Sequence, residues 1–183
     1  MPMASIATLA SLGCALLAIA GIFKVKEPAP TVGAMQALHL PSSMRLVRLM
    51  GLIEIVLGVS AALTGSAGVM ALVGVAYFLF AIVVVAAMKA KTQIQSCGCF
   101  GKTDTPPSWL HLVSNVLFSI VSLVSALKGG KSFPELLANQ SMHAIPFLVT
   151  FAVCLYLVIL GLTVLPSRRS PRFSGVVHRG SRT

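Results

Sequence analysis

Residues 68–88 read GVMALVGVAYFLFAIVVVAAM and contain no charged side chain. At about 1.5 Å of rise per residue, a helix of this length spans about 30 Å, the thickness of the hydrocarbon core of a bilayer. A helix also bonds its backbone polar groups internally, as a segment surrounded by lipid must. We therefore predict that this stretch is a membrane-spanning helix.

Three further stretches lie outward from it and have similar length and polarity. Residues 4–23 and 144–165 hold no charge at all. Residues 46–63 hold Arg48 near one end, where a long side chain can reach the interface, and Glu54 near the middle, where it cannot. Each of the three is predicted to span the membrane.

Trp109 opens a fifth stretch, residues 109–127, directly after a pair of prolines and a serine. An indole ring at the start of an apolar run is typical of the membrane–water boundary. The first stretch, 4–23, has no basic residue before it and is longer than a signal-peptide core, so we expect it to remain as a span. The five stretches predict an all-α membrane protein, a bundle of about five transmembrane helices.

The composition agrees with lipid as the solvent of this chain. Of its 183 residues 56% are hydrophobic and 10% are charged, and the mean hydropathy is +0.92. Soluble domains carry about 25% charged residues. The net charge of +10 does not indicate nucleic-acid binding, because the basic residues lie between spans rather than along one folded face. We expect these residues to set topology and to contact anionic lipid head groups.

The lysines and arginines also predict an orientation. Counted by alternate loops, twelve fall on one side of the membrane and two, Lys128 and Lys131, on the other. The positive-inside rule then places the N-terminus outside and the C-terminus in the cytoplasm. Residues 1–166 would form one transmembrane domain. Residues 167–183, SRRSPRFSGVVHRGSRT, would be a basic tail disordered on the membrane surface.

The candidate reactive site is the loop Cys97-Gly98-Cys99-Phe100-Gly101. A disulfide between residues i and i+2 requires a bend that Gly98 permits, and such a small, strained ring is readily reduced. Nearby lysines favour the thiolate form. The loop therefore predicts thiol–disulfide exchange, with a static disulfide or two idle thiols as the alternative. The count places this loop on the cytoplasmic side, unless a missed span or a re-entrant segment moves it.

The other cysteines and the metal alternative are less informative. Cys14 and Cys154 lie inside apolar helices and are interpreted as small hydrophobic filler. His111 is the one imidazole that could join Cys97 and Cys99 around Zn²⁺ or Cu⁺. A single CxC without a second cysteine or histidine pair is a weak metal signal, so we assign no metal site.

Two groups of polar residues fall inside the spans. Glu54 needs a cationic partner or a proton, and Lys24 or Arg48 is the expected partner. Gly51 and Gly58 share its helix face and would allow a neighbour to approach closely. A polar stripe on residues 109–127 should support interhelical hydrogen bonding or extend the cysteine site; its members are His111, Asn115, Ser119 and Ser122.

Four motifs occur in a fixed order, GIFKVKEP at 21–28, HLP at 39–41, RLMGLIEIVLGV at 48–59 and SCGCFG at 96–101. In that order they resemble the MauE family of the wider DoxX-like membrane proteins. The resemblance implies a four-helix DoxX-like core followed by a C-terminal span, in a bacterial plasma (inner) membrane. It also implies that Lys24 and Glu54 occupy the charged positions of the family.

The resemblance implies a redox role for Cys97 and Cys99 beside a thioredoxin-like partner or a disulfide-containing client. Methylamine dehydrogenase is the client associated with the family. That maturation happens outside the cytoplasm, which conflicts with the charge count. A lipid-soluble quinone could accept the electrons, by analogy with other membrane thiol oxidants, although no quinone motif is present. The alternative is a non-catalytic membrane subunit or small transporter with a structural cysteine loop.

Overall fold

The described part of the chain is built of α-helices. The computed structural model describes residues 3–89, 106–139 and 144–164. Seven helices and no strand occur in these ranges: α1 Met3–Lys26, α2 Ala29–Ala37, α3 Met44–Thr64, α4 Ala67–Lys89, α5 Trp109–Leu127, α6 Phe133–Ala138 and α7 Ala144–Val164.

Five of the described helices, α1, α3, α4, α5 and α7, are long and apolar enough to cross a bilayer. They coincide with the five stretches predicted from hydropathy, with ends that differ by a few residues. The prediction of an all-α bundle of transmembrane helices is therefore confirmed, and the chain is a multi-pass membrane protein. The tail at 167–183 lies outside the described residues.

Local sequence explains where these helices begin and end. α1 ends at Lys26, two residues before Pro28, because proline disfavours helical backbone in the residue that precedes it. α3 begins after Ser43, whose Oγ accepts a hydrogen bond from the Leu46 amide at 3.1 Å. It ends at Thr64 and is followed by Gly65, which has a φ of 60° that glycine adopts without strain.

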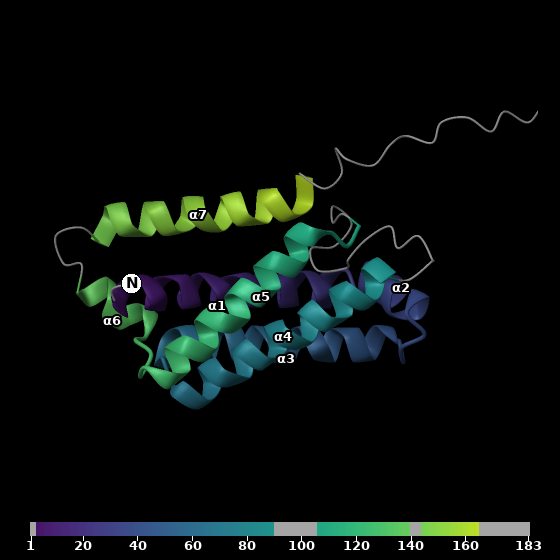
Figure 1. Cartoon of the computed structure of the whole chain (residues 1–183), viewed down its shortest axis with the longest axis horizontal. Helices are drawn as coiled ribbons and strands as arrows, with labels where there is room; N and C mark the ends of the chain where they lie inside the picture. Colours follow the sequence, from purple (N-terminus) through teal and green to yellow (C-terminus); the bar gives the residue numbers. More distant parts are fainter. Residues whose placement is uncertain (1–2, 90–105, 140–143, 165–183) are drawn as a thin grey trace, which may run out of the picture.

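Two closely packed helix pairs, α1 with α3 and α4 with α5, form a four-helix core, and α1 also packs on α5 (Figure 1). A Cβ added at Gly58 of α3 would lie 2.5 Å from the Cys14 carbonyl oxygen of α1. A Cβ added at Gly74 of α4 would lie 2.7 Å from Leu123 of α5. Both pairs therefore depend on glycine for the close approach of helices that is typical of membrane bundles.

α7 lies along one side of this core (Figure 1). Phe147 and Phe151 of α7 pack against Phe133 of α6, with ring centroids 6.2 and 5.0 Å apart. Leu162 is the one buried residue of α7. Cys154 is exposed on the outer face of α7, whereas Cys14 is buried in the core. The filler interpretation therefore fits Cys14 and not Cys154.

α2 and α6 were not predicted as helices. α2 lies in the segment that connects the first two spans, between α1 and α3. α6 carries a complete capping box, in which Ser132 Oγ accepts from the Glu135 amide and the Glu135 side chain accepts from the Ser132 amide. The spacing Ser-x-x-Glu was a visible signal for that short helix.

Candidate functional site

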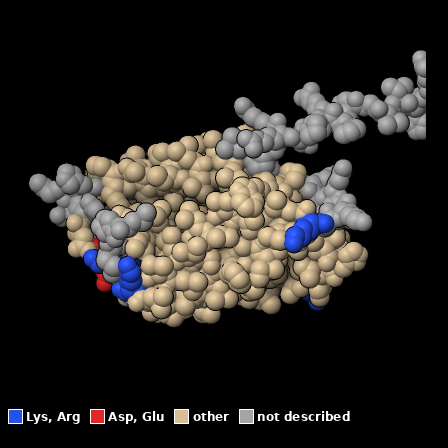
Figure 2. Space-filling model, in the orientation of Figure 1, with Lys and Arg blue, Asp and Glu red and all other residues tan. Residues whose placement is uncertain are grey.

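The core holds a buried ion pair between α1 and α3. Lys24 Nζ of α1 donates to both carboxylate oxygens of Glu54 in α3, each at 2.7 Å. Each residue is 4% exposed. Of the two partners expected for Glu54, the structure selects Lys24, and Arg48 is exposed. The space-filling view accordingly shows its few charged residues only near the two ends of the bundle (Figure 2).

Helix geometry brings these two side chains together. In an α-helix each Cα–Cβ bond tilts toward the N-terminus of the helix. Gly21 faces Gly51 and Cys14 faces Gly58 across the interface, so α1 and α3 run antiparallel. Lys24 therefore leans back along α1 while Glu54 leans the opposite way, and the two meet near the Gly21–Gly51 contact.

The backbones of α1 and α3 lie in close contact beside the Lys24–Glu54 pair. A Cβ added at Gly21 would lie 2.5 Å from the Gly51 carbonyl oxygen, and one added at Gly51 would lie 3.0 Å from Lys24 Cβ. Larger residues at either position would separate the helices. The sequence prediction of a narrow face around Glu54 is thus confirmed, and α1 is the helix that approaches it.

One aromatic residue of α4 lies over the pair, and another lines the adjoining part of the core. Lys24 Nζ lies 5.1 Å from the centroid of the Phe80 ring, within the range of a cation–π contact. The Tyr77 ring packs at 5.4 Å against Phe118 of α5, and its hydroxyl donates to the Gly13 carbonyl oxygen at 2.7 Å. Tyr77 and Phe80 were not identified from the sequence, because they lie within an uninterrupted apolar run.

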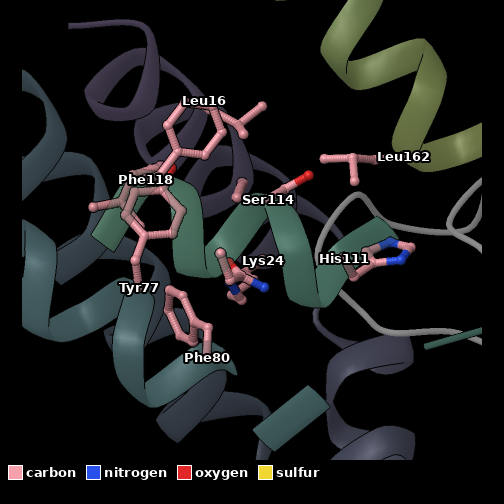
Figure 3. Close-up of a pocket in the computed structure, with 11 residues that line it drawn as sticks. Leu16, Lys24, Tyr77, Phe80, His111, Ser114, Phe118 and Leu162 are labelled. Carbon is pink, nitrogen blue, oxygen red and sulfur yellow. The ribbon is translucent and has the colours of Figure 1, made fainter. Parts of the chain in front are cut away.

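A cavity of roughly 40 Å³ adjoins Lys24 between α1, α4, α5 and α7. Figure 3 shows Lys24 near its middle, with Phe80 on one side and Tyr77 and Phe118 on another, while His111 lies farther along α5. The cavity is lined by Leu16, Leu17, Ala20, Lys24, Tyr77, Phe80, His111, Ser114, Asn115, Phe118 and Leu162.

The predicted polar stripe of α5 faces the core. His111, Ser119 and Ser122 are buried and Asn115 is half-buried. Ser119 Oγ donates to the Gly74 carbonyl oxygen of α4 at 2.9 Å, which ties the two helices together. His111 Nδ1 lies 2.9 Å from the hydroxyl of Ser108, the N-cap residue of α5. The N-terminal part of the stripe, His111 and Asn115, therefore lines a cavity, and Ser119 forms a hydrogen bond with a neighbouring helix.

A second cavity, of roughly 110 Å³, shares Lys24, Phe80 and Asn115 with the first. Its walls come from α1, α2, α3, α4, α5 and the segment between α2 and α3, and it is partly open to the outside of the bundle. Apart from Lys24, Thr31 and Asn115 the lining is hydrophobic; the members are Lys24, Thr31, Ala34, Met35, Leu38, Leu40, Met50, Phe80, Val83, Val84 and Asn115.

The predicted reactive loop Cys97-Gly98-Cys99-Phe100-Gly101 lies outside the described residues. The helices that precede and follow it, α4 and α5, are described. The segment leaves α4 after Lys89 and returns to α5 at Trp109, so it is attached at the end of the bundle where Lys24 and His111 line a cavity. Among the described residues no cluster of three or more His, Cys, Asp or Glu could hold a metal ion.

Five apolar helices, a core built on glycine contacts and a buried Lys–Glu pair define a multi-pass helical-bundle membrane protein. The sequence pattern of the family described as methylamine utilisation protein MauE matches residues 1–128. The chain therefore belongs to the MauE family. The match covers the four-helix core and the cysteine loop, and it is consistent with a role associated with methylamine utilisation. No curated protein and no solved structure matches the chain.

Proposed function

We propose that this MauE-family protein is a membrane thiol–disulfide exchange protein whose reactive residues are Cys97 and Cys99. Its partner would be a thioredoxin-like protein or a disulfide-containing client, as in the maturation of methylamine dehydrogenase. The observation that carries the proposal is the attachment of a Cys-Gly-Cys segment between two tightly packed helices, α4 and α5, within the region matched by the family.

The exchange balances without a further reagent. A thiolate of the partner attacks the Cys97–Cys99 disulfide, forms a mixed disulfide and releases one cysteine thiolate. The second thiol of the partner then attacks the mixed disulfide and releases the other cysteine thiolate. The partner ends with a disulfide and the Cys97/Cys99 pair as a dithiol, with two electrons transferred to the pair. Protons move from the attacking thiols to the leaving thiolates.

In this proposal the buried pair positions the reactive segment and takes no part in the exchange. Lys24 and Glu54 hold α1 against α3, and the Ser119–Gly74 bond holds α5 against α4. Both ends of the cysteine segment are thereby anchored on a rigid core. Phe100 and Gly101 would shape the turn, and Gly98 would allow the two sulfur atoms to meet.

Single and double Cys97→Ser and Cys99→Ser variants test the proposal, with Cys154→Ser as the matched control. Cys154 is exposed on α7, so its loss should leave both the fold and the activity unchanged. Each loop variant should abolish disulfide transfer to the partner, and one of them should trap a mixed disulfide. Full activity of the double variant would refute the exchange function.

Thiol tagging in intact cells tests the side of the membrane. We propose the bacterial inner membrane, with the N-terminus outside and the cysteine loop in the cytoplasm. A membrane-permeant maleimide should tag Cys97 and an impermeant one should not. Tagging by the impermeant reagent would place the loop outside and reverse the orientation. It would also remove the conflict with an extracytoplasmic client.

The competing function is a non-catalytic subunit or a small transporter. It would need polar groups that line a path through the bundle. Glu54 is instead held by two hydrogen bonds from Lys24, and Ser119 is bonded to a backbone carbonyl. These contacts favour packing roles for both residues. Methylamine-dependent growth of the Cys97→Ser/Cys99→Ser strain would favour the competing function.

A further inference from the structure

The larger cavity beside Lys24 has the size and polarity of a site for a small ring. An apolar cavity of about 150 Å³ is known to take up benzene. The present one is roughly 110 Å³ and partly open, with a wall that includes the aromatic ring of Phe80. Its other walls are mostly aliphatic side chains and methionines. A molecule dissolved in the lipid could therefore place a six-membered ring here without losing polar contacts with water.

The charge at the cavity indicates a neutral ligand. Lys24 is the one cation in the lining, and its ammonium donates to both oxygens of Glu54 at 2.7 Å. The formal charge of the pair is zero. A carboxylate or phosphate would have to compete with Glu54 for the ammonium in a medium where an uncompensated charge is expensive. A neutral head group meets no such competitor.

Asn115 supplies the polar recognition. Its side chain is half-buried, borders both cavities and makes no hydrogen bond with another described residue. A primary amide offers two N–H donors and one carbonyl acceptor. It can donate to a carbonyl oxygen and can accept from a hydroxyl at the same place. The residue therefore suits a head group that alternates between those two states.

The cavity also lies close to the ends of the cysteine segment. Val84 precedes Lys89, the last residue of α4, by five positions, and Asn115 follows Trp109, the first residue of α5, by six. At about 1.5 Å per residue these distances along the helix axes are about 8 and 9 Å. Both described anchors of the segment are thus within about two helical turns of the cavity.

We propose that this cavity binds the head group of a lipid-soluble quinone, with a carbonyl oxygen accepting a hydrogen bond from Asn115 and the ring beside Phe80. Conversion of a Cys97/Cys99 dithiol to the disulfide releases two electrons and two protons. Reduction of one quinone to its quinol takes up both. That transfer rests on the proposed function of the cysteines, whereas the binding itself does not.

Ligand binding to the full-length protein in lipid nanodiscs tests the assignment. Trp109 is the single tryptophan of the chain, and a quinone bound nearby should quench its fluorescence. The probes are a benzoquinone with one isoprenoid unit, its hydrocarbon analogue without carbonyl oxygens, and oleic acid. The quinone should quench saturably, and neither of the others should displace it at equal concentration. Displacement by oleic acid would refute a neutral head group, and displacement by the hydrocarbon would refute carbonyl recognition.

Two variants with matched controls localise the site. Asn115→Leu should weaken quinone binding about tenfold through loss of one hydrogen bond, whereas Val116→Leu, on the exposed face of α5, should not. Val83→Phe should fill the cavity and abolish binding, whereas Ile82→Phe, at the adjacent position outside the lining, should not. Equal affinities across all four variants would overturn the proposed site.

The Cys97→Ser/Cys99→Ser variant separates this inference from the function on which its redox step rests. The variant should bind the quinone with unchanged affinity. Absent quinone binding in a protein that still exchanges disulfides with its partner would refute the cavity assignment alone. Intact binding in a protein without thiol exchange would refute the cysteine function alone.

Discussion

α1 and α7 are both long, apolar and free of acidic residues, yet they occupy opposite positions in the molecule. Of the central stretch of α1, 56% is buried, against 6% for α7. α1 presents Gly13, Gly21 and a lysine to its neighbours, whereas α7 presents mainly large aliphatic and aromatic side chains. The difference shows that hydropathy selects the spans, while small and polar residues select which spans form the core.

The family match follows the same division. It ends at residue 128, just after α5, and so includes all four core helices and neither α6 nor α7. The core would then carry the family function, and α7 would be an addition on its side. Three substitutions test how strongly the two regions differ.

The largest effect is expected from breaking the ion pair. Lys24→Met leaves Glu54 buried without its cation and should cost about 3–5 kcal/mol of folding free energy. Lys26→Met, two residues away on the exposed face, should cost little. Thermal unfolding in detergent measures both. The double variant Lys24→Met/Glu54→Leu should recover most of the loss, and failure to recover would assign the lysine a role beyond charge pairing.

A smaller effect is expected at the glycine contact. Gly58→Ala places a methyl group 2.5 Å from the Cys14 carbonyl oxygen, so α1 and α3 must separate. Overpacking of this kind costs about 1–3 kcal/mol. Ala152→Leu on α7 adds more atoms but at an exposed position, and should leave the unfolding temperature within error. Equal destabilisation by the two changes would erase the distinction between the regions.

The smallest effect compares the two tyrosines of the chain. Tyr77→Phe removes the hydrogen bond to the Gly13 carbonyl, and such bonds within membrane bundles contribute about 0.6 kcal/mol on average. Tyr156 is 63% exposed on α7, so Tyr156→Phe should change nothing. Chemical unfolding of both variants in one detergent gives the difference. A larger loss from the α7 variant would show that α7 contacts something other than lipid.

Sequence alone predicted the spans and much of the contact between α1 and α3. Lys24, Glu54, Gly51 and Gly58 stood out because charge and glycine are unusual inside an apolar run. Tyr77 and Phe80 did not stand out, because the residues around them in the sequence are apolar too. Their roles depend on which face of α4 meets α1. The two cavities could not be predicted from the sequence either, because each is lined by residues from several helices. The cysteine loop remains a sequence prediction.

The position of the charged pair also bears on how the chain enters the membrane. Lys24 lies near the end of α1, where its flexible side chain can reach the head groups before α3 has been inserted into the bilayer. Glu54 lies in the middle of α3, so its side chain cannot reach the head groups. It is synthesised after Lys24, however, so that α1 and its lysine are already in the membrane when α3 inserts. The order of the two charges along the chain thus suits a stepwise insertion in which neither is ever stranded in lipid.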